Sequence, residues 1–295
     1  MNGTLELDLT LIVVNYNGQH WLEQLVPDIE VHLLQPDRLR CEVVVVDNGS
    51  TDHSLEILKQ WPWVRVIASP TNQGFACANN LALQTCRSRY AFLLNTDTSL
   101  PADGNLGIVV SYLDEHPKVA VATPNVILSD GSLDPACHRG EPTPWASFAY
   151  LVGLERLLPR SRWFGAYHQG WKDTRTIHPI DACSGAAMMV RIVAVNTVGL
   201  LDERFFMYAE DLDWCRRFRE AGYQIVFHPG ATIIHHKYQS GLEGTSSETR
   251  VSTRFWFYKT MLQYYDKYHP NGQKSLFRWV LKTFIRLKCR QKADR

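Results

Sequence analysis

Hydrophobic residues form nearly unbroken runs at four places in the first hundred positions: 9–16, 41–50, 63–69 and 90–97. Runs that are apolar on both faces are typical of strands buried in a parallel sheet. Between these runs, apolar residues recur at helical spacing over 19–34, 52–60 and 74–86. This alternation predicts an α/β fold in which a doubly wound, mostly parallel sheet is flanked by helices.

The alternation of strand and helix patterns ends after about residue 124. Residues 129–180 are rich in Pro, Gly and Trp without a regular period, which predicts loops and short helices over a site. Residues 223–236 predict two short strands, 240–250 are rich in Gly and Ser, and 251–295 predict helices.

Composition narrows the class of protein. With 295 residues, 45% of them hydrophobic, the chain can bury a full core. A net charge of +1 argues against a nucleic-acid partner, and no apolar run is long enough to span a membrane. The seven cysteines are scattered without a CxxC pair, and the acidic N-terminus does not resemble a secretion signal. We therefore expect a cytoplasmic protein with reduced cysteines.

Polar side chains follow the ends of the predicted strands, where ligands bind in sheets of this kind. They are Asn15, Asn17, Asp47, Asn48, Asn95 and Asp97. The Asp47 carboxylate could accept a hydrogen bond from the ring N–H of a nucleobase, although an Asx turn or helix cap explains it better when it is taken alone. Gly74 stands at a turn into a helix, where N–H groups can face a phosphate or simply begin the helix.

Asn95 and Asp97 lie two positions apart and so point to the same side of their strand. An amide oxygen and a carboxylate placed in this way suit a hard divalent cation with a diphosphate. A polar turn before Pro101 is an equally good explanation. Further on, His235 and His236 end a predicted strand, and their side chains should face opposite ways.

Three acids, Glu210, Asp211 and Asp213, follow the aromatic stretch "RFFMY" at the start of a predicted helix. Macrodipole complementarity and i,i+4 pairing explain Asp213 with Arg217 as an exposed structural pair. They do not explain why Glu210 and Asp211 follow the aromatics. Aromatics beside carboxylates suggest a floor for a sugar with a base at its edge.

Together the motifs resemble glycosyltransferase family 2. The matching stretches occur in the family's order from Leu11 to about Ser240: "VVNYNG", "VVVVDNGSTDHS", "NQGFACANN", "LLNTDT", "CSGAAMMVR", "GLLDERFFMYAEDLDWCRR" and the histidine pair. The resemblance implies the type-A glycosyltransferase fold. The N-x-D form of the fourth motif and the "GLLDERFFMYAEDLDWCRR" stretch look most like the branch that contains bacterial rhamnosyltransferases of cell-surface polysaccharide assembly.

The resemblance also implies roles. Asp211 would be the catalytic base of an inverting, single-displacement transfer, and Glu210 would help to position the acceptor. Asp97 and His235, rather than His236, would hold Mg²⁺ or Mn²⁺ on the diphosphate of the sugar donor. Asp47 would read the base of the nucleotide, within a donor-binding set of Asn15, Asn17, Asp47, Asn48, Gly74, Asn80 and Asn95. Asn95 stands where many relatives have Asp, which removes one negative charge from the metal site.

We expect three parts of the chain: a nucleotide-sugar-binding half over 1–124, an acceptor-binding half over 125–240, and a helical extension over 241–295. The expected partners are a nucleoside-diphosphate sugar and a glycan or lipid-linked saccharide acceptor. Within 276–290, a basic residue recurs every four positions among apolar ones, at Arg278, Lys282, Arg286 and Arg290. This spacing predicts either an interfacial helix on the inner face of the cytoplasmic membrane or a helix packed on the catalytic domain.

Two other classes are weighed against this one. A sugar-nucleotide nucleotidyltransferase would carry a Gly-rich, basic loop after its first strand, and "VVNYNGQHW" has no Lys or Arg. A non-catalytic sugar-nucleotide-binding protein would be favoured by loss of Asp97 or Asp211, and both are present.

Overall fold

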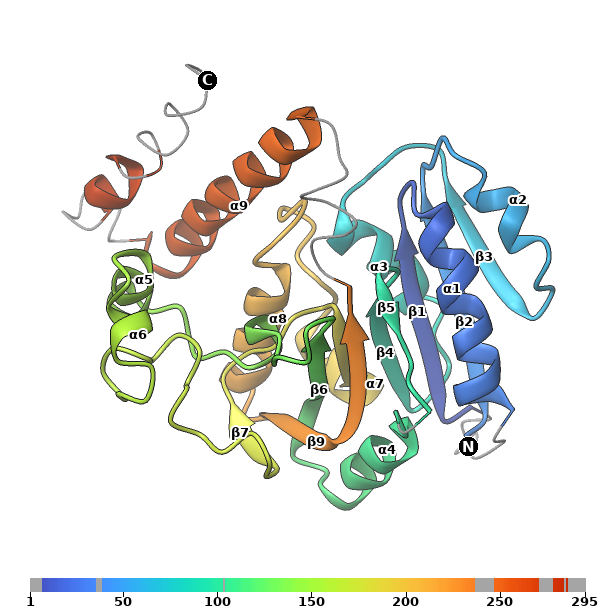
Figure 1. The fold of residues 1–295 in the computed structure, drawn as a ribbon, viewed down its shortest axis with the longest axis horizontal. Coiled ribbons are helices and arrows are strands. Elements are labelled where there is room, and N and C mark those ends of the chain that lie inside the picture. Colours follow the sequence, from blue (N-terminus) through green and yellow to red (C-terminus); the bar gives the residue numbers. More distant parts are fainter. Residues whose placement is uncertain are drawn as a thin grey trace.

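The strands of the described chain form one mixed sheet. The computed structural model describes residues 7–35, 39–102, 104–236, 247–270, 278–283 and 285. The strands are β1 (Leu9–Asn15), β2 (Cys41–Asn48), β3 (Val64–Ser69), β4 (Tyr90–Asn95), β5 (Thr98–Ser99), β6 (Val119–Leu128), β7 (His178–Ile180), β8 (Ala187–Arg191) and β9 (Gln224–His235). Their order is β3-β2-β1-β4-β8-β6-β9-β5, and β7 also pairs with β9 (Figure 1).

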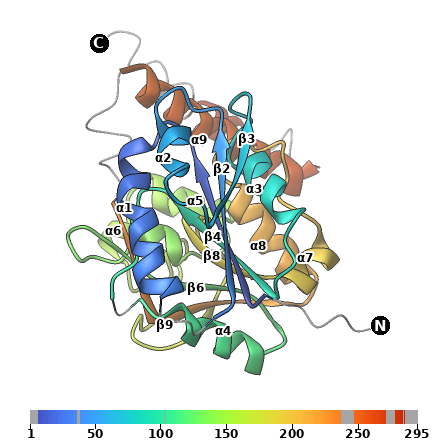
Figure 2. The same ribbon diagram turned by 90° about the vertical axis from the view of Figure 1, so that its right-hand side faces the viewer.

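Helices cover both faces of this sheet, as the sequence predicts. They are α1 (Gln19–Ile29) with its π-helical continuation η1 (Glu30–Leu34), α2 (Ser54–Leu58), α3 (Phe75–Leu83), α4 (Leu106–Glu115), the 3₁₀ turn η2 (Pro135–Cys137), α5 (Pro144–Leu151), α6 (Leu154–Leu157), α7 (Ile192–Val198), α8 (Glu210–Glu220) and α9 (Ser247–Tyr268). Helices α1 and α2 lie on one face, and α3, α7 and α8 lie on the other (Figure 2).

The four apolar runs of the first hundred residues form β1 to β4, which confirms that prediction. These strands are parallel and lie in the order β3-β2-β1-β4. Residues 43–48 of β2 are all buried, as expected for a strand covered by helices on both faces. Because parallel strands share a direction, the polar residues at their ends meet at one edge, where Asn15 pairs with Asp47 in register.

The end of β9 reaches the same edge by a longer route. Strand β8 runs antiparallel to both β4 and β6, so β6 has the direction of β4. Strand β9 is parallel to β6, and therefore its last residue, His235, also ends at the carboxyl edge. The short strand β5 closes the arrangement by pairing Thr98 with His235.

The two short strands predicted over 223–236 are instead one strand, β9. Its register with β6 shifts between Pro124 and Asn125, where the pairing moves from His228 to Thr232. The extra residues bulge out, which bends a strand without ending it. The boundary expected at 124 falls inside β6, so the halves on either side of it share one sheet.

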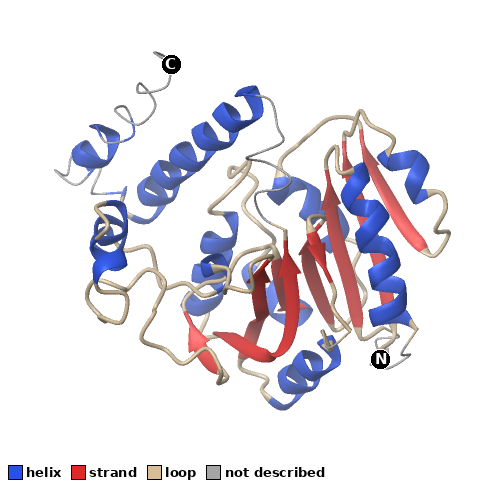
Figure 3. Ribbon diagram, in the orientation of Figure 1, coloured by secondary structure: helices blue, strands red, loops and turns tan. Residues whose placement is uncertain are grey.

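Residues 129–180 are mostly loop, as predicted, and η2, α5, α6 and β7 are their regular elements (Figure 3). Helix α9 lies beyond the carboxyl edge of the sheet (Figures 1 and 2). Its Tyr264 is buried against Phe205 and Ala209 of the loop that leads into α8. Helix α9, within the expected extension, is therefore packed on the catalytic part of the chain.

Part of the predicted basic stripe can be placed. The Arg278 guanidinium donates to the Asp266 carboxylate from Nε at 2.6 Å and from Nη2 at 2.7 Å, and Leu281 is buried. Arg286 and Arg290 lie outside the described residues. Where the structure describes this segment, it thus contacts the protein itself. None of the described helices combines the length and the apolar character needed to cross a bilayer.

Candidate active site

The ends of β1 and β2 are joined by buried polar side chains. Asn15 Nδ2 donates to Asp47 Oδ1 at 2.9 Å and to Ser50 Oγ at 3.1 Å. The backbone N–H of Ser50 donates to Asp47 Oδ2 at 3.1 Å. Asp47 therefore does form the turn that the sequence offered as its simpler explanation. Each of its oxygens keeps a second lone pair, so its predicted contact with a nucleobase stays a prediction.

Asn17 fixes the loop after β1 against the loop after β2. It adopts a left-handed backbone conformation with φ of 51°, which Asn tolerates better than most residues. Its Oδ1 accepts a 2.7 Å hydrogen bond from the N–H of Thr51, and its own N–H donates to Ser50 Oγ at 2.9 Å. The two loops form one rim at the carboxyl edge.

Asn48 and Gly74 shape a second part of this rim. Asn48 Nδ2 donates to Asn72 Oδ1 at 3.0 Å, and Asn48 Oδ1 accepts from the N–H of Gln73 at 2.9 Å. Gly74 has φ of 88°, and a Cβ on it would lie 2.4 Å from the carbonyl oxygen of Phe206. Only glycine fits here, because the start of α3 packs directly on the loop that leads into α8.

Two residues of the predicted donor-binding set have other contacts. Asn80 Nδ2 donates to the carbonyl of Leu201 and to Glu203 Oε1, both at 2.9 Å, and its Oδ1 accepts from the N–H of Leu201. These bonds use both N–H groups of the amide and one lone pair of its oxygen, so Asn80 holds that loop. Asn95 is half-buried, and its N–H donates to the carbonyl of Ala186.

The predicted metal ligands Asp97 and His235 lie together. His235 Nε2 is 3.3 Å from Asp97 Oδ1, and His235 Nδ1 is 2.8 Å from Asp134 Oδ2. His235 and Asp134 are both buried. Burial alone would lower the pKa of His235, but its hydrogen bonds with Asp134 and Asp97 outweigh this and raise the pKa to about 9.

These side chains fit a divalent cation. Adjacent ligands of an octahedral ion with bonds of about 2.1 Å lie about 3.0 Å apart, close to the distance between the Asp97 and His235 atoms. A carboxylate behind the far nitrogen of a histidine is the usual support for a ligating imidazole. Within the described residues, no group of three or more His, Cys, Asp or Glu side chains could hold a metal alone, so a diphosphate would have to supply further oxygens.

His236 faces another way, as expected for neighbours on a strand. Its Nε2 is 2.7 Å from Ser99 Oγ, and its Nδ1 is 3.2 Å from Ser129 Oγ. Its ring stacks on Trp21, with 5.4 Å between centroids. The geometry thus supports His235 over His236 as a ligand.

Glu210 and Asp211 begin α8 after two residues with positive φ, Tyr208 at 70° and Ala209 at 66°. Side chains rarely tolerate this conformation, and its occurrence twice in succession marks a strained turn. The turn presents both acids at the start of the helix, where both are buried. Asp211 Oδ2 accepts a hydrogen bond from Arg139 Nη2 at 2.6 Å.

Arg139 and Asp211 form a buried ion pair, with side-chain exposures of 11% and 10%. Burial would lower the pKa of Arg139, but Asp211 raises it above its ordinary value. Arg139 Nε is also buried and has no partner among the described residues. Glu210 differs from its neighbour, because burial, with the added charge of Asp211, raises its pKa well above the usual 4.5. Glu210 therefore favours its neutral form, whereas the side chain of Asp211 is paired with an arginine.

The segment 134–139 contacts both pairs. Asp134 Oδ2 lies 2.8 Å from His235 Nδ1, and five residues later Arg139 Nη2 donates to Asp211 Oδ2 at 2.6 Å. One short stretch of chain therefore holds a side chain of the metal-ligand pair and a side chain of the acid pair. Tyr208 precedes the two acids, and burial raises its pKa to about 12.

The predicted pairing of Asp213 with Arg217 is confirmed, but the expectation that the pair is exposed is wrong. The side chain of Asp213 is fully buried. Oδ2 accepts from Arg217 Nε at 2.9 Å, and Oδ1 accepts from Tyr268 Oη at 2.7 Å and from Lys267. The reason is α9, which covers this face of α8 and supplies two of the three partners.

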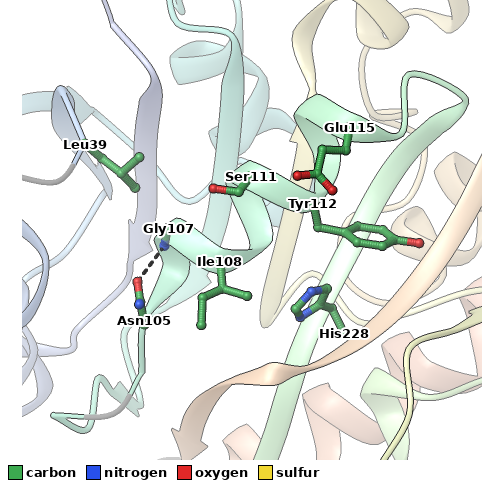
Figure 4. Close-up of a pocket in the computed structure, with 8 residues that line it drawn as sticks. All are labelled: Leu39, Asn105, Gly107, Ile108, Ser111, Tyr112, Glu115 and His228. Carbon is green, nitrogen blue, oxygen red and sulfur yellow. Dashed lines mark hydrogen bonds between the residues drawn. The ribbon is translucent and has the colours of Figure 1, made fainter.

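Two cavities in the described part of the chain lie elsewhere. One of about 500 Å³ opens beside α4 and is lined in part by Ile108, Tyr112, Glu115 and His228 (Figure 4). A second, of about 450 Å³, shares His228 and includes Arg175. Both reach β9 at its middle, whereas the candidate site lies at its carboxyl end, and neither is lined by a predicted site residue.

The fold matches that of solved glycosyltransferases. The structure of GalNAc-T7 with UDP, GalNAc and Mn²⁺ superposes with a TM-score of 0.61 at 16% identity, covering 92% of this chain and 52% of that one. The mannosyltransferase PcManGT from Pyrobaculum calidifontis, in complex with GDP-Man and Mn²⁺, gives a TM-score of 0.60 at 17% identity, covering 96% and 70%. This confirms the predicted type-A glycosyltransferase fold.

Fold and site together define an enzyme of the glycosyltransferase class. The chain belongs to glycosyl transferase family 2, whose model matches residues 10–193. The family transfers a sugar from a nucleotide-sugar donor, which sets aside the nucleotidyltransferase alternative.

Relatives of known name match nearly the whole chain. One is the N-acetylglucosaminyl-diphospho-decaprenol L-rhamnosyltransferase of Mycobacterium tuberculosis (strain H37Rv), which is 25% identical over 292 residues, covering 95% of this chain and 91% of the relative. Another is the rhamnosyltransferase WbbL of Escherichia coli (strain K12), which is 23% identical over 265 residues, covering 86% and 91%. The resemblance to a rhamnosyltransferase branch is thereby confirmed.

Proposed function

We propose that this enzyme transfers a rhamnosyl residue from a nucleoside-diphosphate donor to a hydroxyl of a lipid-linked saccharide, in the synthesis of a cell-surface polysaccharide. The sugar and the lipid-linked acceptor are suggested by the names of the mycobacterial and E. coli relatives. The observation that carries the proposal is that one short segment, 134–139, contacts both pairs: Asp134 holds His235, the neighbour of Asp97, and Arg139 holds Asp211.

The sugar donor is proposed to lie along the carboxyl edge. Its nucleoside would contact the rim built by Asn15, Asn17, Asp47 and Asn48, and its diphosphate would lie near Asp97. Asp97 and His235 would hold Mg²⁺ or Mn²⁺, with Asp134 fixing the ring of His235. The bound cation would supply neutralisation of the negative charge that grows on the departing nucleoside diphosphate.

Asp211 is the proposed base. Its carboxylate would take the proton from the acceptor hydroxyl as that oxygen attacks the anomeric carbon, and the bond to the diphosphate would break on the opposite side. One displacement of this kind inverts the anomeric centre. Arg139 holds Asp211 Oδ2 and so fixes the orientation of the carboxylate. A neutral Glu210 can donate a hydrogen bond, which suits it to position the acceptor.

The test has two stages. A thermal-shift screen of nucleoside diphosphates with Mn²⁺ should single out one base, since a ligand at 100 times its dissociation constant adds about 2.7 kcal/mol of stability. That base, as its rhamnose conjugate, is then supplied with a polyprenyl-diphosphate-linked saccharide, and the product is analysed by mass spectrometry. Binding without transfer of any sugar would support a non-catalytic binder, and transfer of a sugar other than rhamnose would contradict the proposed donor.

A further inference from the structure

Helix α5 shows the reverse of the usual pattern for a surface helix. Its buried residues are the small Ala146 and Ala149, whereas its aromatic residues Trp145 and Phe148 are exposed at 45% and 39%. A surface helix of a water-soluble domain normally turns its large apolar side chains inward. Here small residues pack on the protein and large ones face outward.

The same character continues beyond α5 as far as Trp163. Besides Tyr150, six large apolar side chains between residues 145 and 163 are exposed: Trp145, Phe148, Val152, Leu157, Leu158 and Trp163. Leu157 and Trp163 reach 75% exposure. Three of these residues lie together across the loop: Trp145 Nε1 donates to the carbonyl of Trp163 at 2.9 Å, and the ring of Trp145 lies 5.8 Å from that of Phe148.

The exposed charges of this segment are all positive. Between residues 142 and 171 the charged residues are Glu155, Arg156, Arg160 and Arg162. Glu155 is buried and accepts a 2.9 Å hydrogen bond from the N–H of His168. The three arginines are exposed, and no ion pair involves them in the part of the chain that the structure describes. We call the six apolar residues and these three arginines the α5–α6 surface.

The loop that carries this surface is firmly built. A Cβ on Gly165 would lie 2.2 Å from the carbonyl oxygen of Pro159, so the turn closes tightly on itself. Its two ends are anchored beside the base: Gly140 donates to the carbonyl of Tyr167 at 2.7 Å, directly after Arg139, which holds Asp211. Helices α5 and α6 lie at the end of the molecule opposite β3, nearer to α8 than to β3 (Figure 1).

We propose that the α5–α6 surface docks on the anionic face of a lipid bilayer. Exposed Trp and Leu side chains enter the boundary between headgroups and acyl chains, and flanking arginines bind lipid phosphates. A second copy of this chain fits less well, because the three arginines would meet their own like charges across a two-fold contact. Together with the proposed function, such docking would present a lipid-linked acceptor to the enzyme. Docking requires no turnover, so it can be tested separately from the proposed reaction.

Vesicle sedimentation of the full-length protein tests the proposal. Vesicles contain either phosphatidylcholine alone or three parts of it to one part phosphatidylglycerol. Wild type should bind the anionic vesicles. Leu157→Ser/Trp163→Ser should weaken that binding by at least tenfold, since two apolar side chains no longer insert. Arg156→Gln/Arg160→Gln/Arg162→Gln should weaken it on the order of 100-fold, from about fivefold per cation near an anionic surface.

Matched controls remove equally exposed groups elsewhere. Val193→Ser changes a 63% exposed apolar residue of α7, and Lys59→Gln/Lys118→Gln removes two exposed cations. Both should bind vesicles as wild type does, and every variant should keep its thermal shift with nucleoside diphosphate and Mn²⁺. Because the segment 276–290 is intact in all of them, wild-type binding by both α5–α6 variants would overturn the proposal and assign any binding to another part. The proposal is also overturned if the wild-type protein does not bind anionic vesicles. It is overturned as well if the wild type is a dimer, the α5–α6 variants are monomers, and those variants bind vesicles as the wild type does.

Discussion

At the scale of single residues, Asp211 is predicted to carry the proton transfer while also neutralising a buried arginine. Asp211→Asn should lower turnover by roughly 10²–10⁴-fold, the usual contribution of a general base. It should also lower the free energy of unfolding by about 3 kcal/mol, because Arg139 remains buried without its partner. Steady-state rates and urea titrations measure the two effects.

The double variant Asp211→Asn/Arg139→Gln separates them. It removes both charges, so part of the stability should return, whereas turnover should stay low. If the double variant regains wild-type turnover, the loss in the single variant came from the unpaired arginine, and another group is the base.

Glu210 should make stability depend on pH. Its pKa is raised in the folded state by burial and by Asp211, so the folded protein keeps a proton that the unfolded chain releases near 4.5. This contribution is complete below pH 4.5 and is lost as pH rises toward the raised pKa of the folded state. Glu210→Gln has no such loss. Its melting temperature relative to wild type should therefore increase between pH 5 and pH 8, and a difference that stays constant with pH would contradict a buried, protonated Glu210.

Asp134 is predicted to act on a cation through His235. Asp134→Asn should reduce Mn²⁺ affinity by about 10–100-fold in the presence of nucleoside diphosphate, because the imidazole loses the carboxylate that orients it. Asp97→Ala, which removes a ligand itself, should reduce it further. Isothermal titration measures both, with Asp130→Asn on the exposed turn nearby as the control. Equal Mn²⁺ affinity in wild type and Asp134→Asn would mean that His235 is not a ligand.

At the scale of elements, the sequence spacing predicted the pair of Asp213 with Arg217 within α8 but not the contact that α9 makes with Asp213. Asp213→Asn removes the buried negative charge that pairs with both Arg217 and Lys267. The free energy of unfolding should fall by about 3 kcal/mol, rather than the 1 kcal/mol or less expected for an exposed pair. Chemical denaturation measures this, and Glu220→Gln, which breaks the exposed pair with Arg216 on the same helix, should cost less than about 1 kcal/mol. Similar losses in the two variants would show that α9 does not stabilise α8.

At the scale of the whole molecule, the features that the sequence predicted best are those set by the local spacing of apolar and polar residues. Strands β1 to β4 and the first residues of α8 follow from apolar runs and helical spacing, and the polar residues at strand ends lie where parallel topology puts them. Asp134 and Arg139 could not be found in this way. They come from a segment without a period and reach the site only because β6 and β9 are neighbours in the folded sheet. The burial of Asp213 likewise depends on α9, more than fifty residues further along the chain.

The route by which β9 reaches the carboxyl edge has a consequence for the newly made chain. Strands β1 to β4 can pair as soon as residue 95 has left the ribosome, but Asp97 must wait for His235, which follows 138 residues later (235 − 97). At 5–20 residues per second this delay is roughly 7 to 28 seconds. During it, β6 has no parallel neighbour, and its apolar edge is open to pairing with another chain. Synthesis of this enzyme therefore includes a period in which strands β1 to β4 have formed without the predicted metal-ligand pair.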